Sequence, residues 1–439
     1  MSASAGVIVV GGTVRLVNFD QVLLTSGVCR SGKLPDPGAR EMLFYQDGAT
    51  ATVGAHRTPR GSVVITTNGK PDASLPLRWL QHAGGENVRP TPLSGEGDET
   101  TQVLAPLITL AHQANARHAA VIGQGSGMSS QLLLGDPYLE SLVTIEIEPA
   151  MIEGSKAFLP ANPRPFDDPR ARFLLEDARR AMAQGGEPLD LVFSGPSNPW
   201  VSGVTSLFTV QFYEMVWDRL ADGGVFGQWV HLYEMQDELV LSVLAGIDRT
   251  FPDWSAWLVS AADILVVAGK QPIPSPDWSV ARLPGIKADL GLAPELTAGA
   301  LESLFLFDHQ TLGPLLEGWP ANTDQLPLLE ERAERARFLG AGAEGLFTFA
   351  DHPVNLPRIL ARAGGLADHG GTPRGGAPGS AVASSRRWPV VLRGRACPWS
   401  ACRLEAMVRP VRARRAGPPW TRRRMGRYDL LPERPRILE

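Results

Sequence analysis

The sequence predicts an α/β protein in which a small N-terminal antiparallel β-domain precedes a parallel sheet covered by helices. Short β-favouring runs occupy the first hundred residues, and strands alternate with helices from about residue 101 to 268. Such alternation favours a parallel sheet with helices on both faces. We therefore expect a β-domain over residues 1–97, an α/β domain over 98–275, a helical extension over 276–350 and a tail over 351–439.

The N-terminal strands are predicted from β-favouring runs separated by turn residues. Gly48, a Pro-Arg-Gly turn at 59–61 and an Asn-Gly pair at 68–69 supply the turns. Residues 85–98, rich in Gly, Pro, Glu and Ser, read as a connecting loop. The predicted strands are Met42–Tyr45, Thr50–Val53 and Ser62–Thr66.

The α/β domain is predicted from a change in hydrophobic period at about residue 101. The expected helices are Thr101–Gln113, Met151–Phe158, Phe208–Leu220 and Glu238–Phe251. The expected strands are Ala119–Ile122, Leu142–Ile147, Ala171–Leu175, Asp190–Phe193, Val225–Val230 and Ile264–Ala268.

The charge is unevenly distributed along the chain. Residues 371–439 carry +12, from 16 arginines and four acidic residues, so with an overall −4 the remaining residues carry −16. Phosphate contact needs clustered Lys and Arg on folded structure, so the acidic body argues against a nucleic-acid surface. It suits attraction of a polycation such as a polyamine.

The end of the sequence differs in composition from the rest. Beyond about residue 365, Gly, Pro, Ala and Arg dominate and apolar periodicity ends. Such a segment buries too little surface to offset its ordering entropy, so we predict that residues 351–439 are disordered. The alternative is a basic arm that binds an acidic partner.

Cysteine usage and hydropathy predict a soluble, cytoplasmic protein. Cys29, Cys397 and Cys402 have no metal-like spacing, so we expect no metal site and a reducing compartment. The apolar run at residues 6–10 is too short for a signal peptide. No stretch approaches the roughly 20 apolar residues of a membrane-spanning helix.

A glycine-rich turn follows the first strand of the α/β domain. Gly123, Gly125 and Gly127 let the backbone pass close to a ligand, and the next helix offers free N–H groups. A dinucleotide fingerprint would place its third glycine at Met128. The observed spacing instead fits the nucleoside turn of a Rossmann-like, S-adenosylmethionine-methyltransferase-type sheet. A tight turn without a ligand is the alternative.

Two further acidic positions follow strands of the same sheet. Glu146, at the end of the second strand, could accept hydrogen bonds from both ribose hydroxyls. We predict that Glu148 is a solvated residue at the start of the next helix. Asp177 could bind the adenine amino group and Ala178 could pack near the ring, although a helix N-cap is the alternative role for Asp177.

The fourth piece is the loop after the strand Asp190–Phe193. It reads Gly195-Pro-Ser-Asn198-Pro-Trp200 and lies at the carboxyl end of that strand, where open parallel sheets bind ligands. Its two prolines would stiffen it. Trp200 is as well suited to packing as to forming a substrate platform.

Together these pieces resemble the spermidine synthase family of aminopropyltransferases, most closely the branch often fused to membrane transporter segments. Nearly three quarters of the chain takes part, and the Pro196–Trp200 run followed by Ser206–Phe208 is fairly specific. The other segments that carry the resemblance are Leu23–Gly27, Phe44–Val53, Asn68–Lys70, Gly227–Val230, Asn322–Asp324, Pro327 and Glu330.

The resemblance implies an activity and a set of binding residues. Family members that make spermidine transfer an aminopropyl group from decarboxylated S-adenosylmethionine to putrescine, with no further cofactor. By this resemblance the three glycines line the nucleoside, Glu146 holds the ribose and Asp177 holds the adenine. Members commonly pair through their N-terminal sheets, so we expect a homodimer.

The sequence departs from the family at the residues that carry catalysis. The loop aspartate proposed as the base is Gly195 here, the second loop aspartate is Asn198, and the aspartate of the glycine turn is Ser126. The usual tyrosine has no counterpart among residues 98–102. The catalytic residue is therefore unassigned, and the candidates near the cleft are Asp98, Glu99, His231 and Glu234, with Gln46 as a donor contact.

Three functions remain open on these grounds. The first is an aminopropyltransferase, impaired or acting on an unusual amine, which the strand-rich N-terminal domain favours. The second is an S-adenosylmethionine-dependent methyltransferase on the same sheet. The third is a non-catalytic nucleoside-binding protein, because glycine and asparagine cannot act as a base near neutral pH.

Overall fold

The computed structural model describes residues 20–350, except 29–31, 37, 39, 91–92, 94–97, 202 and 294–295. The predicted disordered tail over 351–439 and all three cysteines lie outside the described residues. Within them, no helix is long and apolar enough to cross a membrane.

The N-terminal part forms a four-stranded antiparallel sheet in the order β1-β2-β3-β4. Its strands are β1 (Glu41–Asp47), β2 (Thr52–Arg57), β3 (Val63–Thr67) and β4 (Lys70–Leu75). The first three were predicted. β4 was not, because its Pro71 and Asp72 are poor strand formers. It begins directly after a tight turn in which Asn68 and Gly69 both have positive φ angles, 50° and 77°.

The larger sheet has eight strands in the order β12-β10-β11-β9-β8-β5-β6-β7. β7, β6, β5, β8 and β9 run parallel, and β11, β10 and β12 extend the sheet antiparallel at one edge. The bounds are β5 (His118–Ile122), β6 (Ser141–Glu146), β7 (Ala171–Leu175), β8 (Leu189–Ser194), β9 (Leu220–His231), β10 (Asp253–Ser260), β11 (Asp263–Gly269) and β12 (Phe305–Asp308).

The predicted α/β class, a small antiparallel sheet followed by a Rossmann-like sheet, is confirmed. The sheet is mixed rather than wholly parallel, and β10 and β12 were missed. β10 is buried on both faces, so it lacks the alternation that marks a strand. Its hairpin to β11 turns through two alanines, Ala261 and Ala262, instead of Gly or Asn.

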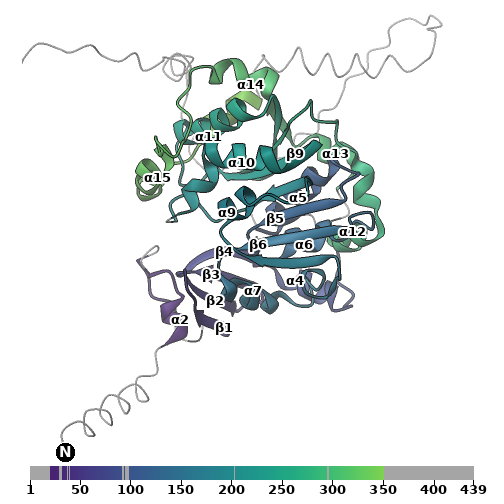
Figure 1. Cartoon of the computed structure of the whole chain (residues 1–439). Helices are drawn as coiled ribbons and strands as arrows, with labels where there is room; N and C mark the ends of the chain where they lie inside the picture. The colour runs from purple at the N-terminus through teal and green to yellow at the C-terminus, as the bar shows by residue number, and fades with distance from the viewer. Residues whose placement is uncertain are drawn as a thin grey trace, which may run out of the picture. The chain divides into compact units, whose positions relative to one another are not determined.

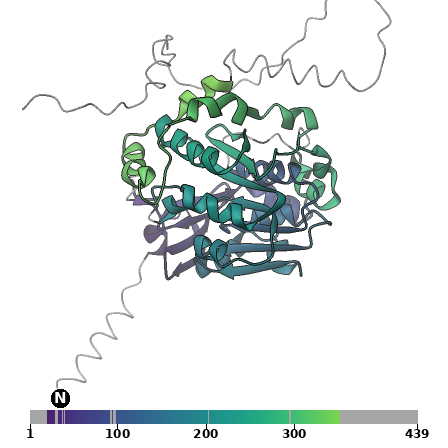
Figure 2. The ribbon, with the colours of Figure 1, turned by 45° about the horizontal axis from the view of Figure 1, so that its top comes forward.

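Helices cover both faces of this sheet (Figures 1 and 2). The apolar core of one face includes α5 (Asp98–Ala111), α6 (Met128–Leu133) and α12 (Pro284–Asp289). The core of the other face includes α9 (Ala178–Ala183), α10 (Val210–Arg219), α11 (Asp237–Thr250), α14 (His309–Leu316) and α15 (Leu328–Phe338). The first core continues into the N-terminal sheet, where Val53 and Ile65 are fully buried.

The remaining α-helices of the described chain are short. They are α2 (Gln21–Leu24), α4 (Leu77–Ala83), α7 (Pro149–Ser155), α8 (Arg164–Asp167), α13 (Ala298–Glu302) and α16 (Phe347–Ala350). Figure 1 shows α7 beside the N-terminal strands, where it packs against β1 and β2. The segment over 276–350 is mainly helical but also supplies β12, and the predicted domain boundaries stay a proposal.

Glu148 fastens the N-terminal sheet to the larger one. It is the N-cap of α7, as its predicted place at a helix start implies, but the prediction that it is solvated is wrong, since only 4% of it is exposed. Its carboxylate accepts hydrogen bonds from Thr50 N (2.7 Å), Thr50 Oγ1 (2.8 Å), Ala51 N (3.2 Å) and Ala150 N (3.0 Å). Burial alone would raise the pKa of Glu148, but these hydrogen bonds outweigh it and lower the pKa.

We expect Glu148→Ala to lower the free energy of unfolding by about 2–3 kcal/mol, because a cap and charge-assisted hydrogen bonds are lost. Since folding lowers the pKa of Glu148, its stabilisation is present above the unfolded-state value of about 4.3 and is lost as the pH falls through the folded-state pKa. Urea unfolding at pH 7 and pH 3 tests this. Equal losses at both pH values would contradict the assignment.

Candidate functional site

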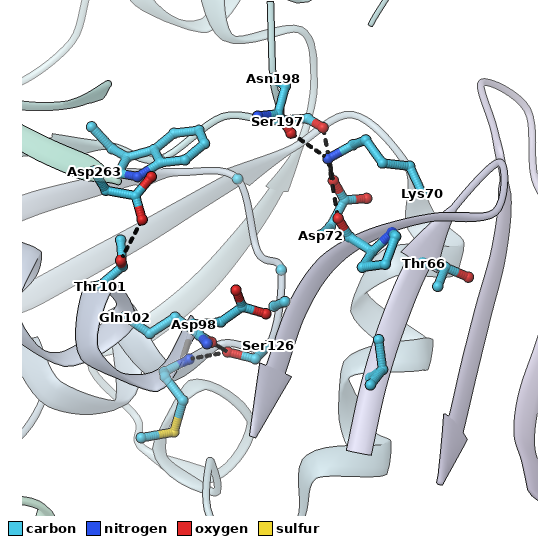
Figure 3. A pocket seen from close by; sticks show the side chains of 18 of the residues that line it. Thr66, Lys70, Asp72, Asp98, Thr101, Gln102, Ser126, Ser197, Asn198 and Asp263 are labelled. Carbon is cyan, nitrogen blue, oxygen red and sulfur yellow. Dashed lines mark hydrogen bonds and ion pairs between the residues drawn. The ribbon is translucent and has the colours of Figure 1, made fainter. Parts of the chain in front are cut away.

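A cavity of about 1050 Å³ lies between the N-terminal sheet and the carboxyl ends of β5 and β8. β4, the glycine turn after β5, the loop after β8 and the β10–β11 hairpin all contribute to its wall (Figure 3). Parallel sheets bind ligands at the carboxyl ends of their strands. The cavity is therefore the candidate site.

The glycine turn needs its glycines. Gly123, Gly125 and Gly127 have φ angles of 88°, 49° and 79°, which side chains rarely adopt. A Cβ on Gly123 would lie 3.0 Å from the carbonyl oxygen of Gly195, so the two loops approach closely at this point. Gly123 and Gly125 line the cavity, and Gly127 is the N-cap of α6.

Glu146 forms a hydrogen bond with the backbone of the glycine turn. Its carboxylate accepts a hydrogen bond from Gln124 N and another from Glu148 N, both at 2.9 Å, and only 9% of the residue is exposed. Burial raises the pKa of Glu146, although the backbone hydrogen bonds oppose this effect. Glu146 is not part of the cavity wall itself, and its role toward a ribose stays a prediction.

Asp177 and Ala178 follow β7, the strand next to β6. Asp177 is the N-cap of α9 and accepts a hydrogen bond from Arg180 N at 3.0 Å, which was the alternative role given to it. Ala178 is buried. Both lie at the carboxyl end of the sheet, close in the strand order to Glu146, but neither is in the cavity wall. Their contact with an adenine stays a prediction.

The loop after β8 is fixed to β4 by an internal ammonium group. Lys70 Nζ lies 2.7 Å from Asn198 Oδ1, 2.6 Å from Asp72 Oδ1 and 3.2 Å from the Pro71 carbonyl oxygen. The side chains of Lys70 and Asp72 are only 11% and 10% exposed. Ser197 Oγ also donates to Asp72 Oδ1, at 2.7 Å. The Lys70 ammonium group thus already occupies the place beside this loop where the Asp72 carboxylate would attract a cation.

Asn198 joins two side chains across the site. Its Oδ1 accepts a hydrogen bond from Lys70, and its Nδ2 donates one to the hydroxyl of Tyr233 at 3.0 Å. An ionised aspartate could make the same contacts only by accepting from both partners, because the Tyr233 hydroxyl can also donate. Asn198 is only 2% exposed.

The charged residues of the cavity wall are mainly acidic. They are Asp72, Asp98, Glu234 and Asp263 against Lys70 and Arg40. His56 also lines the cavity, and burial, aided by Arg40, lowers its pKa to about 4, so it is neutral at pH 7. Among the described residues the wall therefore carries more carboxylates than cations, which favours cationic ligands.

Two of these carboxylates are held by hydroxyl groups. Ser74 Oγ donates to Asp98 at 2.6 Å, and burial, the main influence, raises the pKa of Asp98. Thr101 Oγ1 and Ser260 Oγ donate to Asp263 Oδ2 at 2.8 and 2.6 Å, and burial again raises the pKa. Raised carboxylate pKa values in a cavity are typical of functional groups.

The structure shows which of the candidates for the missing base line the cavity. Asp98 and Glu234 line the cavity, whereas Glu99, His231 and Gln46 are not in its wall. Glu99 instead pairs with Arg78 at 3.2 Å. Within the described residues no group of three or more His, Cys, Asp or Glu side chains could hold a metal ion.

Sequence reasoning missed Asp72 and Asp263. Asp72 lies on the unpredicted strand β4, and Asp263 begins β11 next to the unpredicted strand β10. The signal that could have revealed Asp263 is a lone acidic residue directly before the apolar run Ile264–Ala268.

Part of the chain is similar to known proteins. Residues 100–261 match the spermine/spermidine synthase domain. The chain is 30% identical over 154 residues to polyamine aminopropyltransferase 1 of Pseudomonas aeruginosa, covering 35% of this chain and 53% of that protein. It is 26% identical over 136 residues to the polyamine aminopropyltransferase of Desulforudis audaxviator, covering 31% and 49%.

The chain spans about half the length of the curated relatives it matches. Among solved structures, a probable spermidine synthase from Corynebacterium glutamicum matches with a TM-score of 0.45 and 15% identity, covering 64% of this chain and 96% of that chain. Residues 100–261 are therefore similar to a spermine/spermidine synthase domain, and the chain is similar to polyamine aminopropyltransferases at modest identity.

Proposed function

We propose that the protein is an aminopropyltransferase that uses decarboxylated S-adenosylmethionine and a polyamine acceptor. The observation that carries the proposal is the cavity beside the glycine turn, whose described wall residues include four carboxylates and two cations. Both proposed substrates are cations, and the excess of carboxylates suits them. Similarity to polyamine aminopropyltransferases supports the same assignment.

The donor would lie along the glycine turn. In this proposal Gly123, Gly125 and Gly127 allow the nucleoside to approach the backbone, and Glu146 accepts hydrogen bonds from the ribose. Each oxygen of Glu146 accepts one backbone hydrogen bond and retains capacity for another. Asp177 and Ala178 would contact the adenine at the end of the neighbouring strand.

The reaction requires a base for the attacking amine. The neutral amine nitrogen bonds to the carbon beside the sulfonium, the C–S bond breaks, and its electron pair stays on sulfur in methylthioadenosine. The nitrogen becomes a secondary ammonium, which then loses a proton to give the neutral secondary amine. We assign the proton acceptor to Asp98, because it lines the cavity and burial brings its pKa closer to the working pH.

Because glycine stands at position 195, where the resemblance predicts the catalytic aspartate, two alternative functions have to be tested together with this proposal. A methyltransferase would use S-adenosylmethionine itself, and a non-catalytic nucleoside-binding protein would need no base at all. The transporter-fused branch, a homodimer and a cytoplasmic location also remain proposals.

We expect purified protein to release methylthioadenosine from decarboxylated S-adenosylmethionine when a suitable amine is added. Mass spectrometry with a panel of di- and polyamines is the measurement, with S-adenosylmethionine as the matched donor control. Methyl transfer from that control would establish the second function. No product from either donor, in protein shown to be folded, would leave the binding role.

A further inference from the structure

The two cations of the cavity wall differ in whether their charge is compensated. The Lys70 ammonium group has three donors and lies within 3.2 Å of three acceptor oxygens, so it has no donor left for a ligand. Arg40 forms no ion pair within the described chain, and its Nη1 donates one long hydrogen bond, to the Thr25 carbonyl oxygen at 3.4 Å. A guanidinium group has five N–H donors, so Arg40 retains donors that a ligand can use.

Arg40 lies on the cavity face of the N-terminal sheet. It stands two residues before Met42, which pairs with His56 of β2. Because side chains two residues apart point to the same face of a strand, Arg40 and His56 share this face. Both line the cavity, and Arg40 is close enough to His56 to contribute to its lowered pKa. The N-terminal sheet therefore presents an uncompensated positive charge to the cavity.

The charges of the cavity wall are separated in space. The side of the N-terminal sheet contributes Arg40, Lys70 and Asp72, so one positive charge is in excess there. Asp98 begins α5 and Asp263 begins β11, and Figure 3 shows Asp263 on the side of the cavity away from Lys70 and Asp72. A ligand that carries a carboxylate as well as amines complements both sides, whereas a ligand with ammonium groups alone complements only the acidic side.

The sheet register sets the distance between Arg40 and the proposed base. Arg40 stands beside His56, which pairs with Val64 of β3. Val64 in turn pairs with Ser74 of β4, and the Ser74 hydroxyl donates to Asp98 at 2.6 Å. The two strand spacings of this row place its ends roughly 10 Å apart. An extended chain of five bonds between an amine nitrogen and a carboxylate carbon, with a hydrogen bond at each end, covers a similar length of about 12 Å.

We propose that Arg40 binds a carboxylate of the acceptor, which is then a diamino acid rather than a plain diamine. The donor of the proposed transfer has no carboxylate, so this group belongs to the acceptor. The planar fork of a guanidinium group matches a carboxylate with two parallel hydrogen bonds. With its carboxylate at Arg40, the acceptor extends its terminal amine toward Asp98, and the bonds that form and break are those of the proposed transfer. This inference rests on the proposed function.

The test compares two acceptors that differ in one carboxylate. These are 1,4-diaminobutane and 2,5-diaminopentanoate, and we expect wild-type protein to use the diamino acid with the higher kcat/KM. Arg40→Met should lower kcat/KM for the diamino acid roughly ten- to a hundredfold, as expected for lost charge-assisted hydrogen bonds, and should not lower that for the diamine. Arg40→Lys keeps the charge without the fork and should restore part of the loss.

Arg57→Met is the matched control for the removed charge. Arg57 directly follows His56 in β2, so its side chain points to the other face of the sheet. It is exposed and pairs with Glu41 at 3.6 Å. We expect Arg57→Met to leave kcat/KM unchanged for both acceptors.

Three results would overturn the carboxylate site while the transfer activity stands. They are an equal loss for both acceptors in Arg40→Met, no loss for either, and a wild-type preference for the plain diamine. A loss in Arg40→Met that appears only with S-adenosylmethionine as donor would assign the carboxylate to the donor and would also contradict the proposal.

A binding measurement decides if no acceptor reacts. Calorimetric titration of 2,5-diaminopentanoate then replaces the assay. Binding that weakens at least about tenfold in Arg40→Met but not in Arg57→Met supports the carboxylate site without the transfer. Equal binding to all three proteins, or no binding to wild type, overturns it.

Discussion

Asp98→Asn is expected to lower kcat/KM for aminopropyl transfer by about 10²–10⁴-fold, the usual contribution of a general base. The cavity wall contains Asp98, and Ser74 holds one of its oxygens at 2.6 Å. Asparagine keeps the size of the side chain and can still accept from Ser74, but it cannot take a proton. The loss should therefore appear in kcat, with little change in thermal stability.

The pH profile distinguishes a base from a merely structural carboxylate. Burial raises the pKa of Asp98, so activity should rise with pH through a value above the ordinary aspartate value of about 3.9. The base works when deprotonated, and Asp98→Asn should remove this acidic limb. Asp222→Asn, at an exposed position of β9, serves as control. A normal kcat with the acidic limb intact would refute the assignment of Asp98.

The fold was predictable where the sequence carries local signals. Hydrophobic runs between turns placed β5, β6, β7 and β8 within one residue of their observed ends. The β10–β11 hairpin gave no such signal, because β10 is buried on both faces and its turn is made of alanines. At this edge of the sheet the sequence therefore predicted one strand, whereas the structure has three.

The candidate site was predictable in its glycine turn and in two of its carboxylates, Asp98 and Glu234. Gly123, Gly125 and Glu146 stand in a contiguous strand-turn-strand pattern, and the structure brings the turn and the carboxylate together. The acidic half is built from residues far apart in sequence. Asp72 and Asp263 line one cavity because β4 and the β10–β11 hairpin reach it from different parts of the fold. A local sequence pattern does not predict such a long-range contact.

Gly195→Asp is expected to raise kcat/KM at least about tenfold, because it adds a second possible base to the cavity wall. The backbone of Gly195 does not need glycine, since its φ angle lies outside the left-handed region. A Cβ there would meet only the ring of Phe193 within 4 Å, at 3.1 and 3.5 Å, so a shift of a few tenths of an ångström accommodates it.

The size of this gain depends on whether Asp98 already serves as the base. Gly195→Asp should raise kcat/KM by a larger factor in an Asp98→Asn background than in wild type. The reason is that the two carboxylates would serve as the same base. Gly195→Ala controls for the added Cβ and should leave kcat/KM unchanged. Equal gains for Gly195→Ala and Gly195→Asp would show that loop stiffening, rather than a carboxylate, raises kcat/KM. No gain in either background would mean that position 195 lies outside the path of the transferred proton.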